Sequence, residues 1–115
     1  MAIKEEINYF LKQFREKKSV WSIVFRDDRG KNNSTLAILE ITPNKRIEII
    51  DSLKDVDYSE GPIEEKLNGG ANMWVFGKQI KKQEVYIKIS MGFEGLSVIC
   101  ISFHIAEHPM NYPYK

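Results

Sequence analysis

The order of the periodic segments predicts an α+β fold, in which N-terminal helices pack on an antiparallel sheet that ends in a three-strand meander. Apolar residues recur at helical spacing in the first half of the chain, whereas they alternate with polar residues over 83–104. The chain has 115 residues, of which 43% are hydrophobic. One core and a single domain over residues 1–115 are therefore expected.

Residues 2–18 are predicted to form the first helix, with Lys17 and Lys18 at the negative end of the helix dipole. The apolar side chains that recur on one face of this helix are Ile3, Ile7, Phe10, Leu11 and Phe14. Residues 20–25, VWSIVF, are β-branched and aromatic and predict a strand. The continuous apolar run suggests that this strand is buried on both faces.

A polar turn at 26–33 is expected to lead into a helix over 34–40. The next helix is predicted to begin at Pro43, because proline suits the first helical position and Thr42 is a good N-cap. The apolar stripe of this helix is Ile47, Ile50 and Leu53, with Ile49 beside it.

Residues 54–71 are predicted to be the longest irregular stretch, since Gly61-Pro62 and Gly69-Gly70 interrupt regular structure. The stretch is acidic, but its carboxylates lack the spacing of an EF-hand loop. A solvated loop is therefore expected there.

Three consecutive strands are predicted from residue 72 onward. Residues 72–80 form the first, and the hairpin from Gln83 to His104 supplies the other two. The apolar face of the hairpin is expected to contain Val85, Ile87, Ile89, Ile99, Ile101 and Phe103. Pro109 and Pro113 exclude a helix after this hairpin, so the tail 105–115 is predicted to be extended, with Tyr112 and Tyr114 as anchors.

A net charge of +1 is too small to give the whole protein an electrostatic attraction to nucleic acid. The charges are nevertheless uneven, with a net +3 over residues 1–31, −4 over 32–71 and +2 over 72–115. Both ends of the chain could thus share one basic surface, although blocks of charge are more often solvated faces.

Cys100 is the only cysteine, which excludes an intramolecular disulfide, and its place in a strand predicts a buried, inert thiol. No run reaches the roughly 20 apolar residues of a membrane span. The N-terminal residues also lack the continuous apolar stretch of a signal peptide, so a cytoplasmic protein is expected.

The sequence contains no Walker loop or GxGxxG motif for nucleotide binding, no HExxH motif of zinc hydrolases and no GxSxG motif of serine hydrolases. His104 and His108 are four residues apart, a spacing that can bind a metal on a helix. Because Pro109 makes the segment extended, no metal site is predicted, and no cofactor is expected.

The polar face of the predicted hairpin is the remaining candidate site. Tyr86 and Lys88 share one face of their strand, and Ser102 and His104 share one face of theirs. A histidine can transfer protons near neutral pH, a lysine can neutralise an anion and a tyrosine hydroxyl can donate to it. These groups suit phosphoryl chemistry without a metal, although the pattern also fits ordinary solvent-facing strand residues.

Five segments between Leu39 and Phe103 together resemble the MqsR family of toxins from bacterial type II toxin–antitoxin systems. RIEIIDSL and VDYSEG look like a helix of that family and the acidic-aromatic segment after it. NMWVF resembles its tryptophan-containing strand, QEVYIKIS its VYLKIT strand and VICISF its closing VLIVSF strand. The resemblance covers about 65 residues in the same order.

The resemblance implies a RelE-like fold and metal-independent cleavage of messenger RNA, in which the 2′-hydroxyl attacks the adjacent phosphate. It also implies a cognate antitoxin as partner, with the ribosome as a further candidate. The catalytic residues that it implies are His104, Tyr86 and Lys88, with His104 standing where the family has a lysine.

Two positions depart from the family, since Val75 replaces a glutamine and Glu60 stands near the place of a lysine. Other residues are therefore expected to supply the positive charge and complete the substrate-binding set: Lys78, Arg26, Arg29, Lys31 and Ser102.

Two alternatives to the ribonuclease remain open. The first is a non-catalytic RNA- or protein-binding relative that has kept the sheet and lost the site, which the departures at Val75 and Glu60 favour. The second is a small-ligand pocket under the 54–71 loop and the tail, lined by Trp74, Tyr112 and Tyr114.

Overall fold

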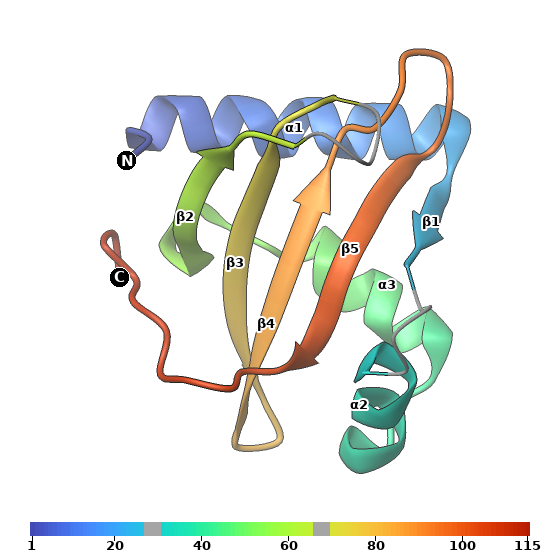
Figure 1. Cartoon of the computed structure of the whole chain (residues 1–115), viewed down its shortest axis with the longest axis vertical. Coiled ribbons are helices and arrows are strands. Elements are labelled where there is room, and N and C mark those ends of the chain that lie inside the picture. Colours follow the sequence, from blue (N-terminus) through green and yellow to red (C-terminus); the bar gives the residue numbers. More distant parts are fainter. Residues whose placement is uncertain (27–30, 66–69) are drawn as a thin grey trace.

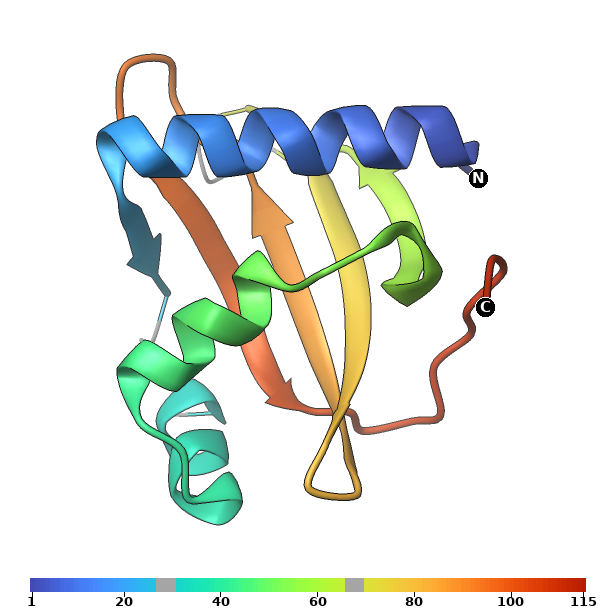
Figure 2. The ribbon, with the colours of Figure 1, turned by 180° about the vertical axis from the view of Figure 1, so that it is seen from behind.

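Helices α1 (Lys4–Trp21) and α3 (Pro43–Asp51) lie on the same face of a five-stranded sheet, and Figure 2 shows both in front of the strands. Helix α2 (Lys31–Leu39) lies beside the end of β5 (Val98–Ile105). This computed structural model describes residues 1–26, 31–65 and 70–115, with the backbone alone for 31–33. No helix in these ranges is long and apolar enough to cross a bilayer.

The sheet is mixed, with the strand order β1-β5-β4-β3-β2 (Figure 1). Strands β2 (Tyr58–Ile63), β3 (Met73–Ile80), β4 (Gln83–Ser90) and β5 pair antiparallel, whereas β1 (Ile23–Phe25) runs parallel to β5. The predicted α+β class is confirmed, and so is the three-strand meander of β3, β4 and β5. The prediction of a purely antiparallel sheet is wrong, because the chain leaves α1 at the end of the sheet where β5 begins.

Strand β1 is a short edge strand, which contradicts the prediction of a strand buried on both faces. Val20 and Trp21 belong to α1, where their side chains are 72% and 49% exposed. The helix therefore takes up the first part of the apolar run and leaves three residues for β1. The backbone N–H of Val98 donates to the Ser22 carbonyl (3.1 Å) and fixes β1 beside the start of β5.

Part of the stretch predicted as irregular, Tyr58–Ile63, is a strand. A 3₁₀ turn at Asp55–Asp57 leads into β2, where Tyr58 is fully buried. The Tyr58 hydroxyl accepts from the Ala2 backbone N–H (3.1 Å) and donates to the Gly61 carbonyl. Because β2 is an edge strand, it tolerates Pro62, which has no backbone N–H to pair.

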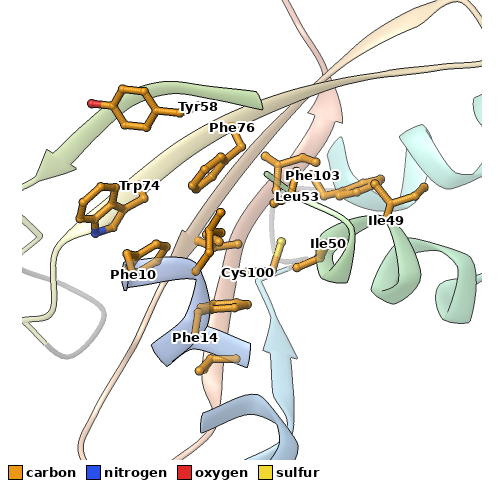
Figure 3. Packing of buried hydrophobic residues seen from close by; sticks show 14 of the residues in the cluster. Phe10, Phe14, Ile49, Ile50, Leu53, Tyr58, Trp74, Phe76, Cys100 and Phe103 are labelled. Atoms are coloured by element: carbon orange, nitrogen blue, oxygen red, sulfur yellow. The ribbon is translucent and has the colours of Figure 1, made fainter. Parts of the chain in front are cut away.

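The core lies between the sheet and helices α1 and α3 (Figure 3). Phe10 of α1 stacks on Trp74 of β3, with ring centroids 4.5 Å apart and an interplanar angle of 12°. Helix α3 begins at Pro43 as predicted, and the Thr42 hydroxyl accepts from the Lys45 N–H (3.1 Å). Helix α3 contributes Ile49 and Ile50 to the core.

A β-bulge in β5 changes which residues face the core. Lys88 pairs with Ser102 and Ile89 pairs with Cys100, so Ile101 is an extra residue in the ladder. As a result Val98 and Cys100 share the core face with Phe103. The prediction that Ile99, Ile101 and Phe103 share that face is therefore wrong. The predicted burial of the Cys100 thiol is confirmed.

The turn between β3 and β4 offers a stabilising substitution. Lys81 and Lys82 both have positive φ, 50° and 69°, which a two-residue hairpin loop of type I′ requires and which asparagine and glycine adopt most easily. We expect the variant K81N/K82G to be more stable by about 1–2 kcal/mol, because glycine removes the Cβ that makes a left-handed residue costly and asparagine tolerates this conformation better than lysine. A thermal melt would measure this gain as an increase in Tm of about 4–8 °C per kcal/mol. An unchanged or lower Tm would contradict the prediction.

Candidate active site

A hollow of about 610 Å³ lies on the face of the sheet opposite α1 and α3. Strand β2, the β4–β5 pair and the C-terminal tail all contribute to its lining. The lining residues that carry polar or titratable side chains are Ser59, Glu60, Tyr86, Lys88, Ser102, His104, Glu107, His108 and Asn111.

Two cross-strand pairs form the part of the hollow that lies on the sheet. Tyr86 pairs with His104, and Lys88 pairs with Ser102, in the antiparallel ladder of β4 and β5. The rings of Tyr86 and His104 are stacked, with centroids 5.1 Å apart and an interplanar angle of 13°. The four residues of the predicted polar face are thus neighbours on one side of the sheet.

The His104 ring has a defined hydrogen-bond partner. Its Nδ1 lies 3.0 Å from the carbonyl oxygen of Ile105. Because a carbonyl oxygen only accepts, Nδ1 carries the proton in this hydrogen bond. In the neutral ring, Nε2 is then the nitrogen with a free lone pair, which is the form that a general base requires.

The Tyr86 hydroxyl is held in its protonated form. Burial raises the pKa of Tyr86, and the nearby carboxylate of Glu60 raises this pKa further. At neutral pH the hydroxyl is therefore a hydrogen-bond donor rather than a base.

Lys88 brings positive charge to this cluster. Its Nζ lies 5.8 Å from the centroid of the Tyr86 ring. Within the described part of the chain, Lys88 is the one lysine or arginine that lines the hollow. Glu60 and Glu107 line the same hollow, so cationic and anionic groups meet there.

Of the other predicted substrate-binding cations, the structure describes the side chains of Lys78 and Arg26, and neither lines the hollow. Lys78 shares the core-side face of β3 with Trp74 and Phe76, and its Nζ binds Asp57 Oδ2 at 3.0 Å. Arg26 follows β1 at the edge of the sheet and is not part of the lining. Arg29 lies outside the described residues, and Lys31 begins α2 with a side chain that is likewise outside them.

The tail lines the hollow together with Ser59 and Glu60, as the predicted pocket between the 54–71 stretch and the tail implied, although through other residues than those predicted. Tyr112 donates from its hydroxyl to Glu84 Oε2 (2.8 Å), and the Met110 backbone N–H donates to Glu84 Oε1 (3.1 Å). Tyr114 donates to the Ala2 carbonyl (2.6 Å). The prediction that Tyr112 and Tyr114 anchor the tail is confirmed.

These contacts place Glu107, His108 and Asn111 along the hollow. The pair of tyrosines was the feature of the sequence that pointed to this position of the tail. Two anchored residues limit where the segment just before them can lie. Their binding partners, however, are far away in the chain.

The predicted ligand pocket of Trp74, Tyr112 and Tyr114 does not form. Trp74 is stacked on Phe10 on the core side of the sheet. Tyr112 lies against Gly77, whose position three residues after Trp74 places it on the opposite face. The sheet itself therefore separates Trp74 from Tyr112.

The hollow and the fold define the chain as an α+β protein with a candidate site on the face of its sheet opposite α1 and α3. No family model, no curated protein and no solved structure matches the chain. Within residues 1–26, 31–65 and 70–115, no three His, Cys, Asp or Glu side chains gather in a way that could hold a metal ion.

Proposed function

We propose that this protein is a metal-independent endoribonuclease of the MqsR type, which cleaves messenger RNA and is neutralised by a cognate antitoxin. The observation that carries the proposal is the stacked Tyr86–His104 pair beside Lys88 and Ser102 on one open face. The resemblance of residues 39–103 to that toxin family supports the choice of RNA as substrate and of an antitoxin as partner.

In the proposed reaction the 2′-hydroxyl of the RNA attacks the adjacent phosphorus. His104 Nε2 accepts the proton of that hydroxyl while the O2′–P bond forms. The ammonium group of Lys88 and the hydroxyl of Tyr86 stabilise the negative charge of the phosphorane. The P–O5′ bond then breaks while a general acid gives a proton to the leaving 5′-oxygen, so the products are a 2′,3′-cyclic phosphate and a 5′-hydroxyl.

The shape of the site suits a single strand better than a duplex. Tail residues, β2 and the β4–β5 pair border the hollow, whose volume of about 610 Å³ is within the usual range for small-molecule sites. A strand that is already unpaired can place one phosphodiester group there without the cost of separating two strands.

The experiment that tests the proposal is a cleavage assay with end-labelled single-stranded RNA in the presence of EDTA. We expect discrete products that end in 2′,3′-cyclic phosphate. A second assay with translating ribosomes and their messenger RNA covers an enzyme that acts only on the ribosome. Absence of cleavage in both assays would overturn the proposal.

A non-catalytic relative that binds RNA or protein is the second candidate, and the carboxylate of Glu60 favours it. This carboxylate lies close enough to Tyr86 to influence its pKa, and a negative charge there opposes a phosphate. Binding of the same RNA without cleavage would support this second function.

Replacing Lys88 by alanine is expected to slow cleavage about 10²–10³-fold, which is the usual loss when one group that stabilises transition-state charge is removed. Lys12→Ala is the matched control, because Lys12 is an exposed lysine of α1, on the covered side of the sheet. Single-turnover rates on one RNA would measure both variants. Equal losses in the two variants would show that general charge, and not the site, is responsible.

A further inference from the structure

The proposed cleavage needs two proton transfers, and the sheet provides an imidazole for one of them. A base must take the 2′-hydroxyl proton, and an acid must give a proton to the leaving 5′-oxygen. General acids work best when their pKa lies near the operating pH, which favours histidine over the ordinary pKa of lysine or tyrosine.

Both histidines of the chain line the same hollow, although they come from different structural elements. His104 is on β5, and His108 is on the tail that follows it. The chain bends at Glu107 and His108, just beyond the end of β5, and both histidines line the hollow, so we expect them to contact one bound group from two sides.

The tail segment that carries His108 is held on the sheet by contacts just after it. Glu84 binds the Met110 N–H and the Tyr112 hydroxyl with its two carboxylate oxygens. Gly77 has no Cβ, which lets Tyr112 lie directly on β3. These contacts lie two and four residues beyond His108, so its position does not depend on a free chain end.

We infer that His108 is the general acid of the site and protonates the leaving 5′-oxygen, with His104 as the base. This inference rests on the proposed ribonuclease function. In the complete reaction one proton passes from the 2′-hydroxyl to His104 Nε2, and one passes from the His108 imidazolium to O5′. The O2′–P bond forms as the P–O5′ bond breaks, and the two histidines end in each other's starting protonation state.

The charged and titratable groups that line the hollow together with His108 come from three strands and the tail. They are Glu60 of β2, Tyr86 and Lys88 of β4, His104 of β5 and Glu107 of the tail. The pH-rate profile of the parent is expected to be bell-shaped, since one imidazole must be neutral and the other protonated. His108→Gln should remove the decrease in rate at high pH, which reports the loss of the acid's proton.

The decisive experiment compares the parent, His108→Gln and His104→Gln on two substrates cut at the same mapped position. One substrate has the natural 5′-oxygen, and the other has sulfur at that bridging atom, which leaves without protonation. We expect His108→Gln to lose roughly 10²-fold or more on the oxygen substrate. It should recover most of that loss on the sulfur substrate, whereas His104→Gln should not recover.

The outcomes separate the two proposals. Cleavage by the parent together with an unchanged rate or an unrescued loss in His108→Gln would overturn the role of His108 alone. Absence of cleavage by the parent, on free RNA and on ribosomes, would overturn both. Thermal melts of each variant provide the folding control, and sulfur rescue cannot arise from a folding defect.

Discussion

Replacing His104 by alanine is expected to slow RNA cleavage by roughly 10²–10⁴-fold, the usual contribution of a general acid–base group. The physical reason is the loss of Nε2, the ring nitrogen left unprotonated when Nδ1 donates to the Ile105 carbonyl. The alanine variant also loses the stacked partner of Tyr86. Single-turnover cleavage of a labelled RNA at several pH values would measure the effect.

Two controls separate the imidazole from the packing around it. Tyr86→Phe keeps the ring that stacks on His104 and removes only the hydroxyl. Any decrease in its cleavage rate therefore measures the hydrogen bond that the Tyr86 hydroxyl is proposed to donate to the phosphorane. A phenylalanine at position 104 keeps a planar ring but transfers no proton, and it should be as slow as the alanine variant. Cleavage by His104→Ala at the parental rate would show that this histidine has no role in proton transfer.

The meander and its polar face were predictable because they depend on local patterns. Apolar and polar residues alternate over 83–90, and two residues connect this segment to the strand before it. Both features are typical of a β-hairpin such as β3–β4. Residues that alternate on paired antiparallel strands meet across the ladder, which brings Tyr86 to His104 and Lys88 to Ser102. Helix α3 was equally local, since Thr42 and Pro43 mark its first turn.

The features that were missed depend on contacts between distant residues. Tyr58 stabilises β2 through hydrogen bonds to Ala2 and to Gly61. The strand was not predicted, because its Gly61-Pro62 pair is typical of a loop. The bulge at Ile101 could not be predicted from the apolar run VICI. When consecutive residues are all apolar, the sequence does not show which of them face the core. The continuous run MWVF likewise concealed that Lys78 faces the core side rather than the hollow.

The tail illustrates the same limit at the candidate site. Its two tyrosines indicated anchoring, but Glu84 and Gly77 lie about 30 residues away along the chain. Nothing local in the sequence links these residues to Tyr112. The RelE-like fold and the ribonuclease function that the resemblance implies remain proposals.

Gly77→Ala is expected to displace the tail from the sheet. A Cβ at this position would overlap the Tyr112 hydroxyl oxygen and lie 2.8 Å from two carbon atoms of its ring. Overpacking of this kind usually costs about 1–3 kcal/mol. Since the Tyr112 hydroxyl also binds Glu84, the displaced tail loses that hydrogen bond as well. Urea denaturation would measure the loss of stability, and amide hydrogen exchange at Met110 would report release of the tail.

The matched control is the same substitution in a chain that lacks the clashing ring. If the cost of Gly77→Ala comes from Tyr112, the double variant Gly77→Ala/Tyr112→Ala should be hardly less stable than Tyr112→Ala alone. The coupling energy from this double-mutant cycle should then be within about 0.5–3 kcal/mol, as for residues in direct contact. If the losses of stability from Gly77→Ala and Tyr112→Ala were additive, the destabilisation by the alanine would arise within β3 and not from contact with Tyr112. Because His108 is held only two residues before Met110, release of the tail should also slow RNA cleavage without any change to the β4–β5 pairs.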